Sequence, residues 1–544
     1  MRYLSENKRE DMRMKKRTAA RSMAALMGAA MVLTACGGGS TTAPTTGASS
    51  GGETQTASES AESGKITKTD IVVGQASDIV TLDPAGQQDT TSGVLMKHAY
   101  STLLDVDNEG KVVPDLAESY EMKSDTEYVF KLREDACFWD GTPVTAQDVK
   151  FSLDRAKGMP KTKSNTSKIE EITVNGDHEV TIKLTEPYAA FKTIVTQHNL
   201  SILSEKAVTE AGDSYGDVDN LLGSGPFKVT EWVPNDHYTL VRNDNYWGEM
   251  PIATSITCRV IPEGSARTIA LEAGEIDVVW SVDPTDCANV ESNPDVKLLS
   301  QPSTGIDYVG MNTQKEKFSD KRVRQAINYA LDKQAFVDTI IEGRGLVANS
   351  YINAAIPGWT DEVEAYPYDP EKAKELLAEA GYPDGFECSI FVNGDLRTRS
   401  AQILQAQLAD VGIKVDISTY EWGALLDTLN AGEHEMFLLG WSNTSFDPDG
   451  STYQLFYSGN HGATGNRAFF SNDKVDELIL SAQRESEESK RMELYKELQF
   501  VLHDESPWCP LYYKENNVGV RADLKGFTLH AGAQHYLGNC HYEE

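Results

Sequence analysis

Cys36 is the residue whose surroundings most clearly indicate covalent chemistry. It lies in the run LTACG at residues 33–37. This run matches the bacterial lipobox, in which a lipid is attached to the cysteine thiol and the leader is cut just before the cysteine. We therefore expect Cys36 to be a lipid anchor on the extracytoplasmic face of a bacterial cell membrane.

The residues before Cys36 have the order of charges typical of a secretory signal peptide. Residues 2–21 hold eight Lys or Arg side chains, and an apolar stretch follows at 23–33. A helix needs about 20 apolar residues to span a bilayer, so this stretch is too short. A basic start followed by a short apolar run and small residues predicts a signal peptide at 1–35.

The segment after the cysteine has the composition of a flexible tether. Residues 37–66 are almost all Gly, Ser, Thr, Ala and Glu. Such a segment buries too little apolar surface to offset its loss of conformational entropy. We expect residues 36–66 to hold a folded body away from the membrane.

The acidic side chains are too numerous for any pair of them to indicate catalysis. The formal charge is -33, and the acids are spread along the chain. Asp369, or Asp447 with Asp449, is therefore weak support for a glycosidase. The sequence contains no Gly-x-Ser-x-Gly or His-Glu-x-x-His motif. We expect a protein that is not an enzyme, and its acidity disfavours nucleic acid as a partner.

The cysteines and histidines do not form a metal-binding pattern. Six cysteines besides Cys36 are far apart and include no C-x-x-C pair. In an exported protein they allow disulfides, and they are equally compatible with buried thiols. His530, His535 and His541 lack the spacing that would place them on one helix face. We expect no metal and no cofactor.

The body after the tether is long enough for at least two lobes, because single cores stop growing at about 250–300 residues. Strands are predicted at 70–74 and 128–132, and a hairpin at 172–184 turns at Asn-Gly-Asp. Helices are predicted from Thr145 through 153 and at 322–341, 370–380 and 398–411, with short strands at 387–392 and 414–417. This alternation predicts α/β lobes with largely parallel sheets.

Ordered sequence blocks along the body resemble one protein family. They are VPDLAESY at 113–120, FKLR at 130–133, FWDGTPVTAQDV at 138–149, GSGPF at 223–227, RNDNYW at 242–247, MN at 311–312, RVRQAI at 322–327, GW at 440–441 and DPD at 447–449. Together they are similar to the extracellular solute-binding proteins, family 5, of peptide and nickel ABC importers, and closest to their dipeptide-binding members.

The resemblance implies a two-lobed periplasmic-binding-protein-like fold of type II that closes on a ligand at a hinge. It places lobe I at 67–305 plus 518–544, with an extra domain inserted, and lobe II at 306–517. It also implies a monomer that delivers a peptide or peptide-like solute to a membrane permease driven by a separate ATPase. A nickel chelate or an oligosaccharide is the alternative solute, and a secreted hydrolase is the alternative class.

The resemblance also suggests ligand-binding residues near Trp441, whose indole offers a large apolar face. In dipeptide-binding members an aspartate three residues after this tryptophan binds the peptide amino terminus. Here that position is Thr444, preceded by Asn443. A hydroxyl accepts a hydrogen bond from an ammonium but supplies no charge. Asp447 is the alternative acid.

Four further residues are candidates from the same resemblance. Arg399 aligns with an arginine that holds the peptide carboxylate in relatives, and Arg397 is the near alternative. Guanidinium geometry suits such a bidentate contact. Tyr308, near the expected hinge, and Trp422 complete the set. The loop at 81–89 is expected to face the cleft from lobe I.

Overall fold

The protein is described here from a computed structural model that covers residues 65–544; Cys36, the predicted leader and nearly all of the predicted tether lie outside this range. One sheet of eleven strands forms the centre, with β14 joined to the side of β18. In spatial order the strands are β16 (Ile413–Thr419), β15 (Phe386–Val392), β17 (Met436–Ser442), β13 (Val296–Met311), β18 (Trp508–Arg521), β12 (Val278–Val279), β2 (Asp70–Gln75), β11 (Ser255–Val260), β10 (His237–Arg242) and β9 (Phe227–Val233), with β14 at Gly345–Val347.

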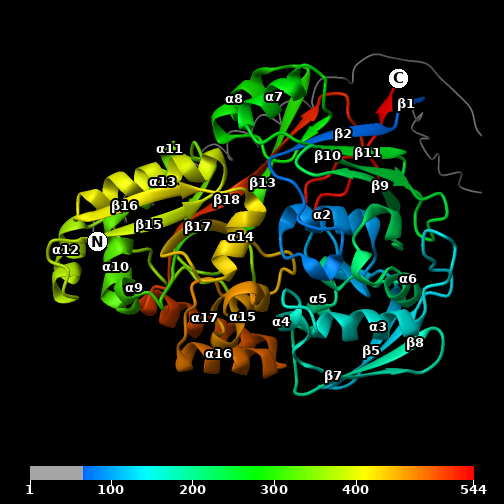
Figure 1. Cartoon of the computed structure of the whole chain (residues 1–544), viewed down its shortest axis with the longest axis horizontal. Coiled ribbons are helices and arrows are strands. Elements are labelled where there is room, and N and C mark those ends of the chain that lie inside the picture. Colours follow the sequence, from blue (N-terminus) through cyan, green and yellow to red (C-terminus); the bar gives the residue numbers. More distant parts are fainter. Residues whose placement is uncertain (1–64) are drawn as a thin grey trace, which may run out of the picture. The chain divides into compact units, whose positions relative to one another are not determined.

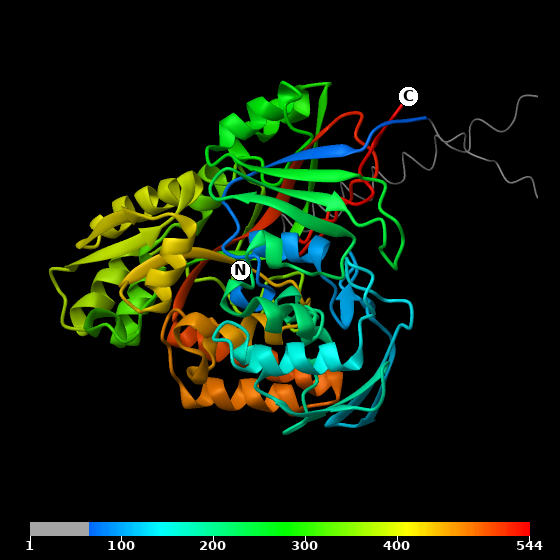
Figure 2. The same cartoon turned by 45° about the vertical axis from the view of Figure 1, so that its right-hand side comes forward.

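Two strands in the middle of this sheet are much longer than the rest. β13 has 16 residues and β18 has 14. They pair antiparallel from Val296 opposite Arg521 to Gly310 opposite Trp508. One end of β18 pairs with β12 and the other with β14, while β13 also pairs with β17. Both long strands therefore run through two halves of the described chain (Figures 1 and 2).

The prediction of largely parallel sheets is wrong. β2 pairs in parallel with β11 and β12, and β15 with β16 and β17. The β9–β10–β11 ribbon and all pairs made by β13 and β18 are antiparallel. The sheet is mixed because β13 and β18 run antiparallel to each other and to their other partners, between the two parallel parts of the sheet.

The apolar cores fall into two groups on either side of the long strands. Two cores consist of residues between 309 and 512 and between 306 and 513. Three others consist of residues before 300 together with Val518 to Cys540. The chain therefore has the two-lobed α/β fold expected. We call 306–517 lobe II and the remaining described residues lobe I; these boundaries stay a prediction.

Lobe I contains a second sheet besides its part of the central one. Four antiparallel strands lie in the order β5 (Ala117–Ser124), β6 (Glu127–Leu132), β8 (Glu179–Leu184) and β7 (Ile169–Val174). The predicted strand at 128–132 and the predicted hairpin are confirmed. Helix α3 (Ala146–Lys157) packs on this sheet, and the predicted helix start at Thr145 is confirmed; Thr145 caps the helix in a capping box closed by Asp148.

The other lobe I elements frame the second sheet and the central one. They are β1 (Ile66–Lys68) with β19 (Tyr542–Glu543), β3 (Leu104–Val106) with β4 (Val112–Pro114), and the helices α2 (Thr90–Ala99), α4 (Lys163–Thr166), α5 (Phe191–Ile194), α6 (Glu205–Ala211), α7 (Gly264–Glu272) and α8 (Cys287–Ser292).

Lobe II is mostly helical around its strands. Its helices are α9 (Glu316–Ser319), α10 (Lys321–Ala330), α11 (Lys333–Thr339), α12 (Pro370–Glu379), α13 (Gly394–Ala409), α14 (Trp422–Asn430), α15 (Asp449–Phe456), α16 (Asp473–Arg484) and α17 (Glu488–Glu505). The predicted single helix at 322–341 is wrong. It breaks after Ala330, because Asp332 leaves helical geometry and its carboxylate caps α11 by accepting from the Gln334 and Ala335 amides.

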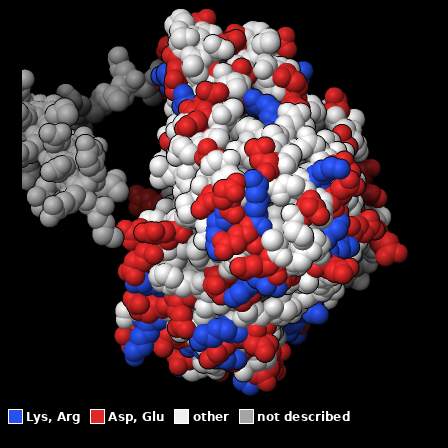
Figure 3. All heavy atoms as spheres, turned by 90° about the vertical axis from the view of Figure 1, so that its left-hand side faces the viewer, with Lys and Arg blue, Asp and Glu red and all other residues white. Residues whose placement is uncertain are grey.

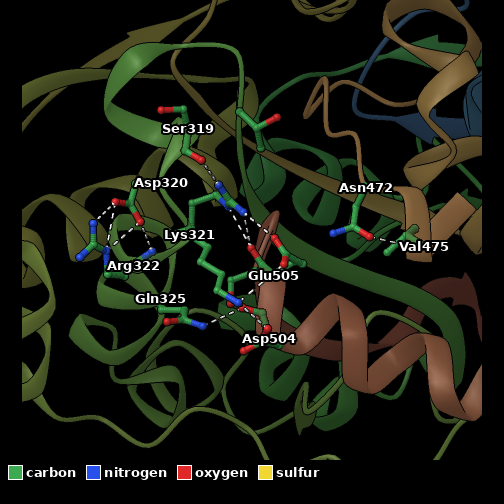
Figure 4. A network of polar contacts seen from close by, with 12 residues as sticks. Ser319, Asp320, Lys321, Arg322, Gln325, Asn472, Val475, Asp504 and Glu505 are labelled. Carbon is green, nitrogen blue, oxygen red and sulfur yellow. Dashed lines mark hydrogen bonds and ion pairs between the residues drawn. The ribbon is translucent and has the colours of Figure 1, made fainter.

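Polar contacts tie the start of α10 to the end of α17 (Figure 4). Lys321 forms an ion pair of 2.6 Å with Asp504, and Gln325 donates to the Asp504 carbonyl oxygen. The buried Arg324 guanidinium donates to the Glu505 carbonyl oxygen at 2.6 Å. These bonds satisfy carbonyl groups that a helix end leaves open, and they fix α17 beside β18, which begins three residues later.

The described residues have a surface of mixed charge, and their cysteines are free thiols. Figure 3 shows acidic side chains scattered over one face with basic ones between them, consistent with the spread of acidity along the sequence. Within residues 65–544 no helix is long and apolar enough to cross a membrane. The six cysteines in this range are free thiols, five of them buried, so buried thiols and not disulfides are what the structure contains.

Gly310 allows β13 to pass close to its neighbour β17. A Cβ atom at this position would lie 2.1 Å from the Phe437 ring. We expect Gly310→Ala to lower the free energy of unfolding by about 1–3 kcal/mol, the usual cost of overpacking a core. Gly423→Ala is the matched control, because a Cβ there meets no atom within 4 Å. Chemical denaturation measures both, and equal stability of the two variants would contradict the packing argument.

Candidate functional site

The two lobes are in direct contact through side chains of both. Tyr188 donates to Asp449 at 2.5 Å, Gln454 donates to Asn165 at 2.6 Å, and Thr444 donates to Gln197 at 3.0 Å. Ion pairs add Arg399 with Asp283 and Arg484 with Glu186. The structure therefore describes the lobes closed on each other.

Thr444 borders a small cavity at the lobe boundary. The cavity has a volume of about 10 Å³, and its walls include Lys97, Gln197, His198, Thr444 and His530. A space of roughly this size holds a single water molecule. Thr444 thus donates a hydrogen bond to Gln197 across the boundary. The cavity beside it is too small for a solute.

Several buried polar atoms at the lobe boundary have no hydrogen-bond partner among residues 65–544. They come from both lobes: Asp89 Oδ2 from lobe I, and Arg397 Nε, Trp422 Nε1 and Trp441 Nε1 from lobe II. Unsatisfied buried polar groups are rare in native proteins and call for a partner. Together with Arg399 Nε, which is also buried without a partner, these atoms need hydrogen-bond partners that residues 65–544 do not supply.

Arg397 and Trp422 lie next to each other in this group. The Arg397 guanidinium is 5.8 Å from the centre of the Trp422 ring, within the range of a cation–π contact. Arg397 also donates to Asn393 at 2.7 Å, and its Nε lies 3.9 Å from Asp307. Asp307 is already paired with Lys514 at 2.8 Å. The Arg397 charge is therefore only partly neutralised.

Asp89 approaches the same group from lobe I. It begins α2, and its Oδ1 accepts from the Ser92 amide at 2.9 Å. Burial raises the pKa of the Asp89 carboxyl, while the hydrogen bonds from Ser92, the charge of Lys161 and the nearby Trp422 indole counteract this rise. The neighbouring Gln88 donates to Gln454 of lobe II. The loop ending at Asp89 thus faces lobe II.

Arg399 points elsewhere, although it lies on the same helix as Arg397. Its guanidinium is 2.6 Å from Asp283 of lobe I, and it is about one-third exposed. The two arginines are two residues apart on α13 and so project from different faces of the helix. Arg399 joins lobe II to lobe I through Asp283, whereas the Arg397 guanidinium lies against the Trp422 ring.

Asp447 and Asn443 are used inside lobe II. Asp447 receives two hydrogen bonds from Arg491, at 2.9 and 2.5 Å, and accepts from the Asp449 amide. The Asn443 amide nitrogen donates to the Asp447 carbonyl and to Ser451. These bonds hold the turn between β17 and α15, which carries Thr444.

Tyr308 belongs to the core of lobe II. It is 2% exposed, and its ring stacks on Trp508 with the ring centres 3.4 Å apart. Burial raises the pKa of its hydroxyl, while the Arg467 and Arg397 cations act in the opposite direction. Tyr308 is therefore a core residue of lobe II. Trp441 is half-buried on the neighbouring strand β17.

The ion-pair partners that decide the roles of Asp447 and Arg399 could not be predicted from the sequence. Arg491 is 44 residues from Asp447, and Asp283 is 116 residues from Arg399. The burial of Arg467 was likewise not predictable, since no motif or spacing marks it. A short run of mixed residues such as NRAF at 466–469 carries no signal of burial. Among residues 65–544 no group of three His, Cys, Asp or Glu side chains is arranged to hold a metal ion.

Comparison with known proteins gives a consistent result. Residues 111–463 match the family described as bacterial extracellular solute-binding proteins, family 5 Middle. The glutathione-binding protein GsiB of Escherichia coli K12 is 32% identical over 479 residues, covering 85% of this chain and 92% of its own. The dipeptide-binding protein of the same organism is 30% identical, covering 80% and 86%.

Solved structures agree in fold. The binding protein DppA of Helicobacter pylori, in complex with the peptide STSA, has a TM-score of 0.84 at 28% identity and covers 88% of this chain and 99% of its own. The protein AgaA of A. tumefaciens, in complex with agropinic acid, has a TM-score of 0.82 at 27% identity, covering 87% and 99%.

The pairing of Asp447 with Arg491 predicts a structural phenotype. We expect Arg491→Met to lower the free energy of unfolding by about 3–5 kcal/mol, because it leaves the Asp447 carboxylate buried without its counter-ion. Lys490→Met, on the exposed side of the same helix, should leave the denaturation midpoint unchanged. A stable Arg491→Met protein with altered solute binding would instead indicate that Asp447 contacts the solute.

Asp449 predicts a pH dependence of stability. Burial and the neighbouring Asp447 raise its pKa to about 6 from an ordinary value of 3.8. The folded protein holds this proton more tightly than the unfolded chain. The contribution of Asp449 is therefore fully favourable below 3.8 and is lost as the pH rises through about 6, by on the order of 1–3 kcal/mol. Asp449→Asn should lack this change, so denaturation of both proteins at several pH values should give diverging curves. Parallel curves would contradict it.

Proposed function

Because the chain belongs to the family 5 bacterial extracellular solute-binding proteins, we propose that it is the substrate-binding lipoprotein of an ABC importer. It captures a peptide or peptide-like solute between its lobes and delivers it to a membrane permease. A separate ATPase supplies the energy, since the sequence has no Gly-x-x-x-x-Gly-Lys-Ser/Thr loop.

The observation that carries this proposal is the group of unpartnered polar atoms at the lobe boundary. Arg397, Trp422 and Trp441 of lobe II and Asp89 of lobe I have buried nitrogen or oxygen atoms without a partner among residues 65–544. A solute with an amide backbone and charged ends supplies donors and acceptors for such atoms. In our proposal Arg397 binds a carboxylate, and the two indoles form the walls.

The names of the relatives support a peptide-like solute. They include a glutathione-binding protein, a dipeptide-binding protein and a structure in complex with the peptide STSA. Glutathione and short peptides share amide bonds, an ammonium group and carboxylates. Agropinic acid, the compound bound in the AgaA structure, also has a carboxylate. The carboxylate is thus the common element, and it matches the role proposed for Arg397.

The site differs from the dipeptide pattern at Thr444. The hydroxyl there donates to Gln197 across the boundary, so it helps to close the lobes. The nearby Asp447 is neutralised by Arg491. Asp89 is the carboxylate that remains for a cationic group of the solute. Thr444, Asn443 and Asp447 then shape and support the site from behind.

The anchor is part of the same proposal. A lipid on Cys36 and a tether at 36–66 keep the closed receptor within reach of the permease on the extracytoplasmic face of the membrane. The sequence of residues 33–37 supports this, together with the extracellular setting of the family.

Mass spectrometry of the small molecule that co-purifies with the protein tests the function directly. We expect a dipeptide, an oligopeptide or a compound with peptide bonds. Recovery of an oligosaccharide or a nickel chelate would replace the proposed solute while leaving the importer role. Turnover of the released molecule by the purified protein would contradict the whole proposal, since a binding protein returns its solute unchanged.

Arg397 and Arg399 provide a matched pair of variants. We expect Arg397→Met to weaken solute binding by about 30-fold or more, as for the loss of one partner of a buried charge pair. Arg399→Met removes only a partly exposed ion pair with Asp283 and should change the dissociation constant by no more than about 5-fold. Isothermal titration measures both. The reverse order would show that Arg399, the residue first expected from the resemblance, holds the carboxylate.

A further inference from the structure

Residues 530–537, which we call the C-terminal strap, are held in place by three buried histidines of lobe I. Two of them lie in the strap itself, and the third, His98, lies on α2. The His98 Nδ1 donates to the Val94 carbonyl oxygen at 2.8 Å, and its Nε2 accepts from the Leu537 amide at 3.0 Å. These two bonds fix one neutral tautomer of His98, since a proton on Nε2 would point at the Leu537 N–H.

The two histidines within the C-terminal strap make bonds of the same kind. His530 Nδ1 accepts from the Gly532 amide at 3.1 Å and from the Gln534 amide at 3.4 Å. His535 Nδ1 accepts from the His530 amide at 3.1 Å. A proton on either ring nitrogen would remove these bonds and bring two donors together. The observed fold of the strap therefore requires both imidazoles to be neutral.

The C-terminal strap is bonded to both long strands where they pass between the lobes. The Ala531 carbonyl oxygen accepts from the Thr304 amide of β13 at 3.1 Å and from the Asn516 side chain of β18 at 2.9 Å. The Thr304 carbonyl oxygen accepts in turn from the Asn443 amide of lobe II at 3.4 Å. A change in the strap therefore reaches both long strands and the turn that carries Thr444.

Burial makes the protonated forms of the three histidines unfavourable. It lowers the pKa of His98 and of His530 to about 4, and the pKa of His535 to about 3, from an ordinary value of 6.5. The Lys97 ammonium lowers the pKa of His98 and His530 further, and His530 that of His535. When the strap is released into water, we expect each pKa to return to its ordinary value. The bound strap is therefore fully stable above pH 6.5 and loses stability as the pH falls from there towards 4.

The charged groups around His530 do not provide a counter-ion for its protonated form. Lys97 of α2 is paired with Asp105 of β3 at 2.9 Å. Asp105 and Asp107 raise the pKa of His530, but burial and Lys97 outweigh them. His198 borders the same small cavity as His530, and burial lowers its pKa as well. The other rings beside the three histidines carry no charge: Phe227 and Tyr536 at His98, Phe446 of lobe II at His530, and Trp280 and Phe527 at His535.

We propose that the C-terminal strap makes closure of the lobes sensitive to acid: protonation of His98, His530 and His535 frees the strap, loosens the junction of β13 and β18, and opens the lobes. Acid then releases the solute, because a solute held between the lobes binds the closed arrangement. This last step rests on the solute-binding function proposed above. One histidine whose pKa falls from 6.5 to about 4 on closure favours the open arrangement by roughly 30-fold more at pH 5 than at pH 7.5.

Hydrogen exchange of two amides, followed by mass spectrometry, tests the strap and the closure separately. The Leu537 amide reports on the strap, because it is bonded to His98. The Ala189 amide of lobe I reports on closure, because it donates to the Gln483 carbonyl oxygen of lobe II at 2.8 Å. After correction for the intrinsic exchange rate, we expect both amides of the wild-type protein to lose at least about 10-fold of their protection between pH 7.5 and pH 5.

Variants that keep an acceptor but cannot be protonated identify the cause of this loss. His98→Gln, His530→Asn and His535→Asn each place an amide oxygen near the accepting ring nitrogen. The triple variant should lose less than about 3-fold of its protection at pH 5. His237→Gln, which removes an imidazole of β10 bonded to Asp236, is the control and should keep the full wild-type loss.

Three results would overturn the proposal. They are wild-type protection that does not depend on pH, an equal loss in the triple variant, and a loss at Leu537 without a loss at Ala189. If the triple variant does not fold, His98→Gln alone decides the matter, because it leaves the strap sequence unchanged. It should make the loss at Leu537 smaller than in the wild-type protein, and an unchanged loss would count against the strap.

Retention of the co-purified molecule distinguishes failure of this proposal from failure of the proposed function. Dialysis at pH 5 should remove at least about 10 times more of it from the wild-type protein than from the triple variant. Equal retention in both proteins would overturn the regulation of release. Turnover of the molecule, or the absence of any bound molecule, would reject the proposed function instead. In that case the exchange of the Ala189 amide still decides whether acid opens the lobes.

Discussion

The antiparallel pair β13–β18 is the constraint on which the rest of the structure depends. Both strands contribute side chains to the cores of both lobes, so neither lobe folds without them. Their register is interrupted between Pro302 and Ile306 and again between Asp307 and Tyr308. Irregular pairing of this kind bends strands and increases their local twist. The change of direction between the lobes therefore occurs beside Asp307, which faces Arg397 and Lys514.

This position explains why so many charges at the lobe boundary are already paired. Asp447 with Arg491, Asp307 with Lys514 and Arg399 with Asp283 each neutralise a group near the junction. The Asp447–Arg491 pair is buried on both sides, and such a pair costs desolvation energy that only good geometry offsets. The first pair fixes the turn between β17 and α15. The second fixes β13 where its pairing is irregular, and the third joins α13 to lobe I. Arg397 is less completely neutralised than these groups, because its acid partner Asp307 lies 3.9 Å away and is shared with Lys514.

Local features could be predicted from the sequence, whereas long-range pairings could not. The helix start at Thr145 and the hairpin of β7 and β8 depend on residues within a few positions, and both are confirmed. The break between α10 and α11 depends on one carboxylate, that of Asp332, which caps the start of α11. Strand directions in the central sheet depend on partners hundreds of residues apart. The resemblance suggested Trp441 and the α13 arginines, and it could not show that Arg399 pairs with lobe I, because its partner Asp283 is 116 residues away.

Thr444 stands where the resemblance to dipeptide-binding proteins leads one to expect an aspartate, and this changes the charge at the lobe boundary. An acid at 444 would place a negative charge at the boundary, where the present hydroxyl binds Gln197 and adds none. Asp447, the nearest acid along the chain, is bound by Arg491, and Asp449 accepts from Tyr188 across the boundary. At position 444 the lobes are thus joined by a neutral hydrogen bond, which costs less to bury than an unpaired carboxylate would.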